Sequence, residues 1–451
     1  MRNWFQLSVN AVPKKHLLII SYYFPPMGGG GIQRISKLLK FWDYAEYKVS
    51  VLTVKSSFFY AEDTSLQVDI PKPVSIYRTE TLDPFRLLFF VNRLLGRSST
   101  KSRKYSKESG AFLRKISGVL FLPDSRILWL PFALKFIRKI HKKYHIDIIL
   151  ATVPPFTAGI IAYFAWRIYN IPFIIDFRDS WTDNPYLPHV SRLHYFLQNL
   201  LEKLVVNIAN GITFVNPNLK KFYLKKYPEL ELKNIQVVRN GYDPDDFPQH
   251  KVDKSKMDKI FRIGIMGTVY SQGNSPEPLL AAVSELLKES PDIKDKLRIV
   301  FIGKWSIDFL KKIGVYQIDH LLEWVDYLPH TQALTAANGM DAFALAIEDQ
   351  HSGSENVTPG RIYEYLYFKK PILAMCPLES DIAWLIQNCQ AGVAVEYNQR
   401  IAIKQILKNW IENKESFYHL YGFVRTEIYH RHNQAVQMLQ FINKIKLKES
   451  C

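Results

Sequence analysis

The residues around Arg361 and Glu364 combine groups able to bind a phosphate and a sugar hydroxyl. Thr358, Pro359 and Gly360 predict a helix start, with a hydroxyl that can cap the helix and a proline whose φ is already helical. A helix N-terminus presents unpaired amide N–H groups and a positive dipole end, which favour an anion. Arg361 adds a permanent cation, and Glu364, one turn later, can accept hydrogen bonds from sugar hydroxyls. An ordinary capped helix, whose charged side chains are solvated and bind no ligand, is the alternative interpretation of these residues.

A glycine-rich loop near the start of the chain is a second candidate for ligand binding. Residues 17–20 form an apolar run that predicts a buried parallel strand, and the loop is followed by a helix at 32–45 and a strand at 49–54. This order opens a doubly wound α/β domain. Glycine backbone can approach a ligand closely because no Cβ intervenes. The candidate ligand-binding residues of this region are Gly29, Gly30, Gly31 and Arg34. Arg34, one turn into the helix, can reach an anion bound by the glycine loop.

The loop does not match the fingerprint of a dinucleotide-binding domain. No GxGxxG is followed by an acidic residue at the end of the second strand, where Lys55 stands instead. A nicotinamide cofactor is therefore disfavoured, and a merely flexible loop is the alternative.

Charged residues follow the strand predicted at 173–175. Asp176, Arg178 and Asp179 come at its carboxyl end, which is where open α/β sheets bind ligands. We expect Arg178 and Asp179 to line one side of a cleft, with a structural ion pair as the alternative. A strand, a glycine turn and a helix begin again at Ile263, which predicts a second parallel α/β domain.

Several stretches resemble the family 4 glycosyltransferases, which have the GT-B fold. PGRIYEYLYFKKPILA, at residues 359–374, resembles their donor-binding signature, and YYFPPMGGGGIQR resembles their first loop, near the donor phosphate and the acceptor. TVPPFT, DFRDSW and VRNGYD resemble further segments, the last an interdomain loop. The resemblance spans residues 17–395. It implies that Glu364 binds the nucleotide ribose and that the preceding turn holds the diphosphate.

Two positions depart from the family pattern. Asn356 stands where the family has the first Glu of a Glu, seven residues, Glu motif, and Glu355 lies one place earlier, so we expect one of the two to bind the donor sugar. After the turn at residues 267–268, the family normally supplies a cation for the diphosphate, and none is found at 269–274. The expected replacements are Arg361 and Lys304.

The resemblance implies two doubly wound parallel-sheet domains that face each other across a cleft. Residues 1–250 are expected to bind the acceptor, residues 251–420 the nucleotide-sugar donor, and residues 421–451 to cross back to the first domain. The expected catalytic residues, which would stabilise the departing nucleotide diphosphate, are Arg361, Glu364 and Arg178. The expected substrate-binding residues are Gly29, Gly30, Gly31, Arg34, Asp179, Asn240, Gly267, Thr268, Lys304, Glu355, Asn356, Thr358, Pro359 and Gly360. No cofactor and no metal are expected, since no Asp-x-Asp clamp is evident, and retention of anomeric configuration is implied by analogy.

Length and composition favour a folded, two-domain protein of the cytoplasm. The chain has 451 residues, of which 47% are hydrophobic and 22% charged. Its three cysteines have no metal-ligand spacing, which favours a reducing compartment. Residues 1–12 are too polar for a signal peptide, and no run reaches the ~20 apolar residues that span a bilayer.

The formal charge of +17 predicts a polyanionic partner. Basic residues alternate with apolar ones between Pro84 and Lys143, including a predicted helix at 129–143 with aromatics on one side. Such stretches suit an anionic membrane surface, here the inner face of the plasma membrane, and a packed helix with a solvated basic face is the alternative. No RRM, KH or zinc-finger pattern supports nucleic-acid binding.

The function expected from these residues is transfer of a sugar from a nucleotide diphosphate-sugar to a glycan or lipid-linked acceptor, in cell-surface polysaccharide or lipopolysaccharide synthesis. A GT-B-like nucleotide-sugar epimerase is the alternative within the same fold. A basic nucleic-acid-binding protein is the alternative from another class, and a degenerate, non-catalytic domain is also consistent with the departures from the pattern.

Overall fold

The computed structural model describes residues 14–55, 63–82, 121–184, 191–248, 259–270, 272–349 and 353–445. The basic stretch expected at residues 84–109 lies outside the described residues. Within them, no helix combines the length and the apolar character that crossing a membrane requires.

The first sheet has seven parallel strands in the order β3-β2-β1-β4-β5-β6-β7. Its strands are β1 Lys15–Ile20, β2 Tyr47–Val54, β3 Ser75–Thr79, β4 Ile148–Val153, β5 Phe173–Phe177, β6 Gly211–Phe214 and β7 Asn234–Val237. Every residue of β4 and β5 is buried, because a parallel sheet is covered on both faces. The covering helices include α1 Gly30–Lys40, α4 Leu130–Tyr144, α5 Thr157–Tyr169, α6 Arg192–Ile208 and α7 Pro217–Lys226.

The second sheet has six parallel strands in the order β10-β9-β8-β11-β12-β13. Its strands are β8 Phe261–Val269, β9 Leu297–Trp305, β10 Leu322–Val325, β11 Ala342–Ala346, β12 Ile372–Met375 and β13 Gly392–Val395. One face packs against α8 Glu277–Glu289, α9 Ile307–Ile313 and α13 Arg400–Glu412. The other packs against α10 His330–Ala337, α11 Arg361–Phe368 and α12 Asp381–Asn388. The predicted pair of doubly wound parallel-sheet domains is therefore confirmed.

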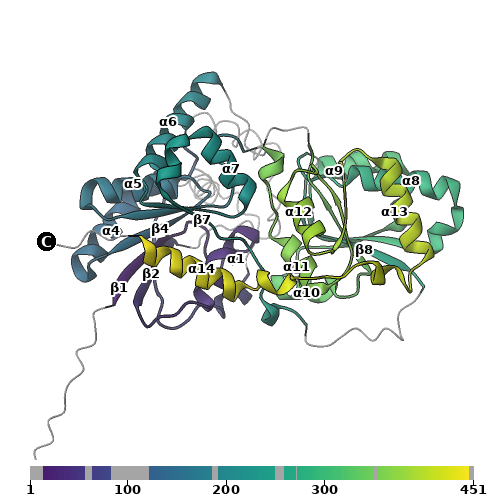
Figure 1. Cartoon of the computed structure of the whole chain (residues 1–451), viewed down its shortest axis with the longest axis horizontal. Helices are drawn as coiled ribbons and strands as arrows, with labels where there is room; N and C mark the ends of the chain where they lie inside the picture. Colours follow the sequence, from purple (N-terminus) through teal and green to yellow (C-terminus); the bar gives the residue numbers. More distant parts are fainter. Residues whose placement is uncertain are drawn as a thin grey trace, which may run out of the picture.

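The last helix, α14 Arg431–Lys444, leaves the second domain and packs against the first (Figure 1). Met438, Phe441 and Ile442 share a buried cluster with Leu17 and Ile19 of β1. The segment just before α14 stays with the second domain, because Tyr429 packs in the cluster around α11.

The first helix is shorter than the sequence predicts. The helix expected at 32–45 ends at Lys40, and Asp43 Oδ1 instead accepts a hydrogen bond from the backbone N–H of Ala45 at 2.8 Å. Such a local bond offers the backbone an alternative to the helix. Strand β7 ends at Val237, directly before the segment VRNGYD that resembles an interdomain loop.

Candidate active site between the two domains

The turn before α11 lies at the contact between the domains. Asn216, in the first domain, donates from Nδ2 to the Asn356 carbonyl at 2.8 Å and to Thr358 Oγ1 at 3.0 Å. Thr358 Oγ1 donates in turn to Asp381 Oδ2 at 3.1 Å. The prediction that Thr358 caps α11 is therefore wrong, because its hydroxyl is used in the domain contact. Gly360 takes the N-cap position and is exposed.

Arg361, the expected replacement cation, lies against Gly267, which falls within β8 near its carboxyl end. Its Nη1 donates to the Met266 carbonyl, and a Cβ added at Gly267 would lie 2.9 Å from the same nitrogen. Gly267 also has a φ of +94°, so a glycine is favoured twice over at this position. Arg361 Nε is buried without a hydrogen-bond partner in the part of the chain that the structure describes. The guanidinium thus retains a donor for a ligand, next to the exposed Gly267 and half-exposed Thr268.

Glu364 is less open than the sequence suggested. The residue is 8% exposed, and its Oε1 lies 2.8 Å from Nε2 of His330, the first residue of α10. Burial alone would raise the pKa of Glu364, but the charges of His330, Arg431 and Arg361 and the hydrogen bond with His330 hold that pKa below its usual value. A ribose hydroxyl must therefore approach a carboxylate that already has an imidazole partner.

The other predicted donor residues flank this turn with different degrees of exposure. Asn356 is 5% exposed and turns its amide toward Glu355, with Nδ2 3.3 Å from Oε1. Burial against the domain contact leaves the half-exposed Glu355 as the more accessible of the two. Lys304 pairs in register with Thr268 and places Nζ 4.8 Å from the centre of the Tyr327 ring. Burial lowers the pKa of Lys304.

The glycine loop of the first domain meets Arg178. Arg178 donates to the carbonyls of Gly31, Pro154 and, at 3.3 Å, Val153. A Cβ added at Gly31 would lie 2.6 Å from Arg178 Nη1, so this position needs glycine to let the guanidinium approach. Burial raises the pKa of the neighbouring Asp179, and the charge of Arg178 opposes that rise only in part. The structure therefore brings Gly31, Arg178 and Asp179 together at the carboxyl ends of β4 and β5, whereas a Cβ added at Gly29 would meet no atom within 4 Å.

Arg34, predicted to bind substrate, belongs to the buried framework instead, whereas Asn240 beside it is half-exposed. Arg34 is 1% exposed and forms a bidentate pair with Asp176, with Nε–Oδ2 at 2.8 Å and Nη2–Oδ1 at 2.7 Å. Its remaining donors reach the carbonyls of Val238 and Arg239 and the Asn240 side chain. The prediction for Arg34 is wrong because α1 places its guanidinium against Asp176, which would otherwise be an uncompensated buried charge. Substrate binding by the half-exposed Asn240 stays a prediction.

Charged residues that the sequence analysis missed join the site to the interdomain segment. Lys37 Nζ lies within 2.5–2.8 Å of carboxylate oxygens of Asp69, Asp243 and Asp246. These three carboxylates are close enough together to hold a cation, and the lysine ammonium already lies among them. His330 lies beyond Asp246, with Nδ1 3.6 Å from Oδ2. No sequence spacing signalled this cluster, because its members come from separate elements of both domains.

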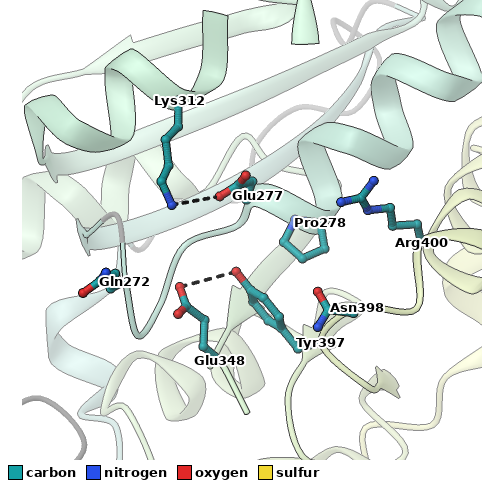
Figure 2. A pocket seen from close by; sticks show the side chains of 8 residues that line it. All are labelled: Gln272, Glu277, Pro278, Lys312, Glu348, Tyr397, Asn398 and Arg400. Carbon is teal, nitrogen blue, oxygen red and sulfur yellow. Dashed lines mark hydrogen bonds and ion pairs between the residues drawn. The ribbon is translucent and has the colours of Figure 1, made fainter. Parts of the chain in front are cut away.

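A polar pocket of about 310 Å³ lies on the second domain, at the carboxyl ends of its strands (Figure 2). It is lined by Gln272, Glu277, Pro278, Lys312, Glu348, Tyr397, Asn398 and Arg400. Its charges are partly satisfied internally, because Lys312 Nζ lies 3.5 Å from Glu277 Oε2 and the Tyr397 hydroxyl 3.5 Å from Glu348 Oε1. None of the predicted site residues lines it.

Comparison with known proteins identifies the fold and a family region. The sequence model of Glycosyltransferase Family 4 matches residues 97–246. Sucrose-phosphate synthase from Thermosynechococcus elongatus is similar in structure, with a TM-score of 0.64, 10% identity and coverage of 96% of this chain and 99% of that one. A trehalose 6-phosphate synthase from Burkholderia multivorans aligns with a TM-score of 0.61, 10% identity and coverage of 96% and 97%.

A putative UDP-N-acetylglucosamine 2-epimerase from Listeria monocytogenes aligns with a TM-score of 0.55, 12% identity and coverage of 95% of this chain and 96% of that one. No curated protein matches the chain in sequence. At these identities the structural matches establish the fold, which is GT-B, as predicted. The family match confirms the resemblance to family 4 glycosyltransferases over residues 97–246.

Proposed function

We propose that this chain, a GT-B protein with a family 4 glycosyltransferase region, transfers a sugar from a nucleotide diphosphate-sugar to a glycan or lipid-linked acceptor. The observation that carries the proposal is the position of Arg361. Its guanidinium lies against Gly267, beside the exposed start of α11. Its Nε is buried and has no hydrogen-bond partner among the residues that the structure describes. A cation and a helix N-terminus at one point suit a diphosphate.

The two sides of the site would divide the reaction between them. Arg361 and the N–H groups of α11 stabilise the negative charge that develops on the departing nucleotide diphosphate, which is the main electrostatic demand of the step. Glu364 accepts a hydrogen bond from the ribose, and Glu355 binds the donor sugar. Gly31, Arg178 and Asp179 position the acceptor from the first domain. We further propose that the transfer retains anomeric configuration and needs no metal ion.

The setting we propose is cell-surface polysaccharide or lipopolysaccharide assembly in the cytoplasm, on the inner face of the plasma membrane. Helix α4 supports a surface contact, because Lys135, Arg138, Lys139, Lys142 and Lys143 are all exposed. The aromatic anchors expected on this helix have another role. Trp129 is fully buried just before α4, and Phe132 and Phe136 pack against the core. The contact with an anionic surface would therefore be electrostatic, without insertion of these rings.

Donor binding by wild-type protein and an Arg361 variant tests the proposal. Nucleotide diphosphate-sugars are screened by thermal shift, and the affinity of each hit is measured by calorimetry. A hydrogen bond to a charged group contributes about 1.5–3 kcal/mol, so we expect Arg361→Met to weaken donor binding by roughly 10- to 150-fold. Lys369→Met, which removes a cation from the other end of α11, is the matched control. Equal donor affinity in Arg361→Met and wild type would remove the diphosphate role.

Nucleotide-sugar epimerisation is the second candidate, favoured by the structural likeness to the Listeria epimerase. The two activities differ in their need for an acceptor. An epimerase turns over its donor in acceptor-free buffer, whereas a transferase requires an acceptor for stoichiometric release of nucleotide. Nucleotide release that requires an acceptor identifies the transferase. An epimerase keeps the nucleotide on the sugar and is identified by the epimeric nucleotide-sugar that forms without acceptor.

A further inference from the structure

A chain of charged side chains runs from the proposed donor site into the first domain. His330 Nε2 lies 2.8 Å from Glu364 Oε1, and His330 Nδ1 lies 3.6 Å from Asp246 Oδ2. Asp246 Oδ1 lies 2.5 Å from Nζ of Lys37 on α1. The four groups alternate in charge when the imidazole is protonated, so each is attracted to its neighbours.

His330 is held at the junction of the two domains by more than its ring. Its backbone N–H donates to Asp63 Oδ2 at 3.0 Å, which ties the start of α10 to the first domain. The side chain is 11% exposed. The charged groups that act on the His330 ring are Glu364 on α11, Asp246 on the interdomain segment and Lys37 on α1. Asp63 faces the backbone N–H of His330, and Arg431 on α14 acts on Glu364.

The balance of these groups favours the protonated ring. Burial alone would lower the pKa of His330, and the charge of Lys37 acts in the same direction. The charges of Glu364 and Asp246 and the hydrogen bond to Glu364 outweigh them and raise the pKa of His330 above its ordinary value of 6.5. An imidazolium has two N–H donors, whereas the neutral ring has one and loses the attraction to both carboxylates.

We propose that His330 is a positioning residue whose protonated ring aims the Glu364 carboxylate at the donor and ties it, through Asp246, to Lys37 of the first domain. The inference rests on the proposed donor role of Glu364. Deprotonation of the ring weakens both ends of the link at once. Donor affinity therefore falls as the pH rises through the His330 transition.

The link itself is tested on the donor-free protein by NMR titration of the His330 ring. The chain has 12 histidines, so the His330 signal is identified by its loss in His330→Gln. We expect a midpoint above 6.5 in the wild type and lower midpoints in Glu364→Gln and Asp246→Asn, each of which removes a facing carboxylate. Asp245→Asn is the matched control, because Asp245 is an adjacent acid that pairs with Lys40. Midpoints that coincide in all of these proteins overturn the proposal.

The consequence for the donor is tested by calorimetry across the same pH range. Wild-type affinity should fall with rising pH, and Asp246→Asn should move that fall to lower pH. His330→Gln keeps an amide donor without titrating, so its donor affinity should be nearly independent of pH, and His330→Ala should bind about tenfold more weakly than wild type below the transition. A His330→Gln curve that matches the wild type contradicts the inference. Absence of donor binding in every protein, with the NMR midpoints as expected, contradicts the proposed function but leaves the link intact.

Discussion

The buried pair of Arg34 and Asp176 gives the most direct test of how the first domain is held together. Asp176 is fully buried on β5, and besides both donors of Arg34 it accepts the hydroxyls of Thr152 at 3.0 Å and Thr213 at 2.8 Å. Arg34→Met removes the guanidinium while keeping an unbranched apolar stem. The carboxylate then retains only its neutral donors.

The size of the effect follows from leaving one buried charge without its partner. Breaking such a pair from one side typically costs about 3–5 kcal/mol. For a unit of 150–250 residues, each kcal/mol lowers the melting temperature by about 2–4 °C, so we expect Arg34→Met to lower it by roughly 6 to 20 °C. Gln33→Met, at the preceding position of α1, controls for the effect of a methionine in this helix.

The pH dependence of this loss has a defined sign. In the wild type, burial would raise the pKa of Asp176, but the charge and hydrogen bonds of Arg34 hold it below 3.8. The wild-type carboxylate therefore contributes stability above pH 3.8 that is lost as the pH falls through its lowered pKa. Without Arg34, burial raises the pKa of Asp176. The variant then protonates Asp176 at higher pH and no longer carries an unpaired buried charge. The difference between the two proteins should be largest near pH 7 and shrink toward pH 4.

Thermal unfolding followed by circular dichroism measures these differences. Arg34→Met/Asp176→Asn should be more stable than Arg34→Met alone, since the amide keeps the hydroxyl contacts without a charge. The reasoning is refuted if Arg34→Met melts with the wild type and instead loses affinity for the donor. That result would restore Arg34 as the anion-binding residue that the sequence suggested.

Two further predictions concern the first domain. Gly31→Ala places a Cβ 2.6 Å from Arg178 Nη1, and the displaced guanidinium should lower donor turnover by about 10- to 100-fold, measured with the donor and acceptor found by screening. Gly314→Ala, whose Cβ would meet no atom within 4 Å, is the control, and equal turnover in both would contradict the placement. Replacing Lys139, Lys142 and Lys143 of α4 by Gln should weaken binding to anionic vesicles on the order of 100-fold at about 1 kcal/mol each. The same change at Lys288, Lys294 and Lys311 should not, and unaltered co-sedimentation of the α4 variant would exclude this surface.

The fold was predictable because its signal is local. Runs such as residues 17–20 and 148–151 are continuously apolar, which is what strands covered on both faces require. A cation near Gly267 was also predictable, because the family's usual cation is missing from residues 269–274 and the resemblance then points to Arg361 or Lys304 as its replacement. The partners of Arg34 and Glu364 were not. Asp176 lies 142 positions from Arg34 and His330 lies 34 from Glu364, so only the folded chain shows which charges are already paired.

Because α14 follows the second domain in sequence but packs on the first, the first domain can be completed only after the second has been synthesised. A Cβ at Gly211 of β6 would meet Ile445 at 2.7 Å and Phe441 at 3.0 Å, so the far end of the chain fits closely against the N-terminal sheet. On a ribosome adding about 5–20 residues per second, the surface under α14 waits roughly 10–40 s after residue 248 before its cover emerges. During that interval the apolar side chains that α14 covers, Leu17 and Ile19 of β1 among them, lack this part of their cover.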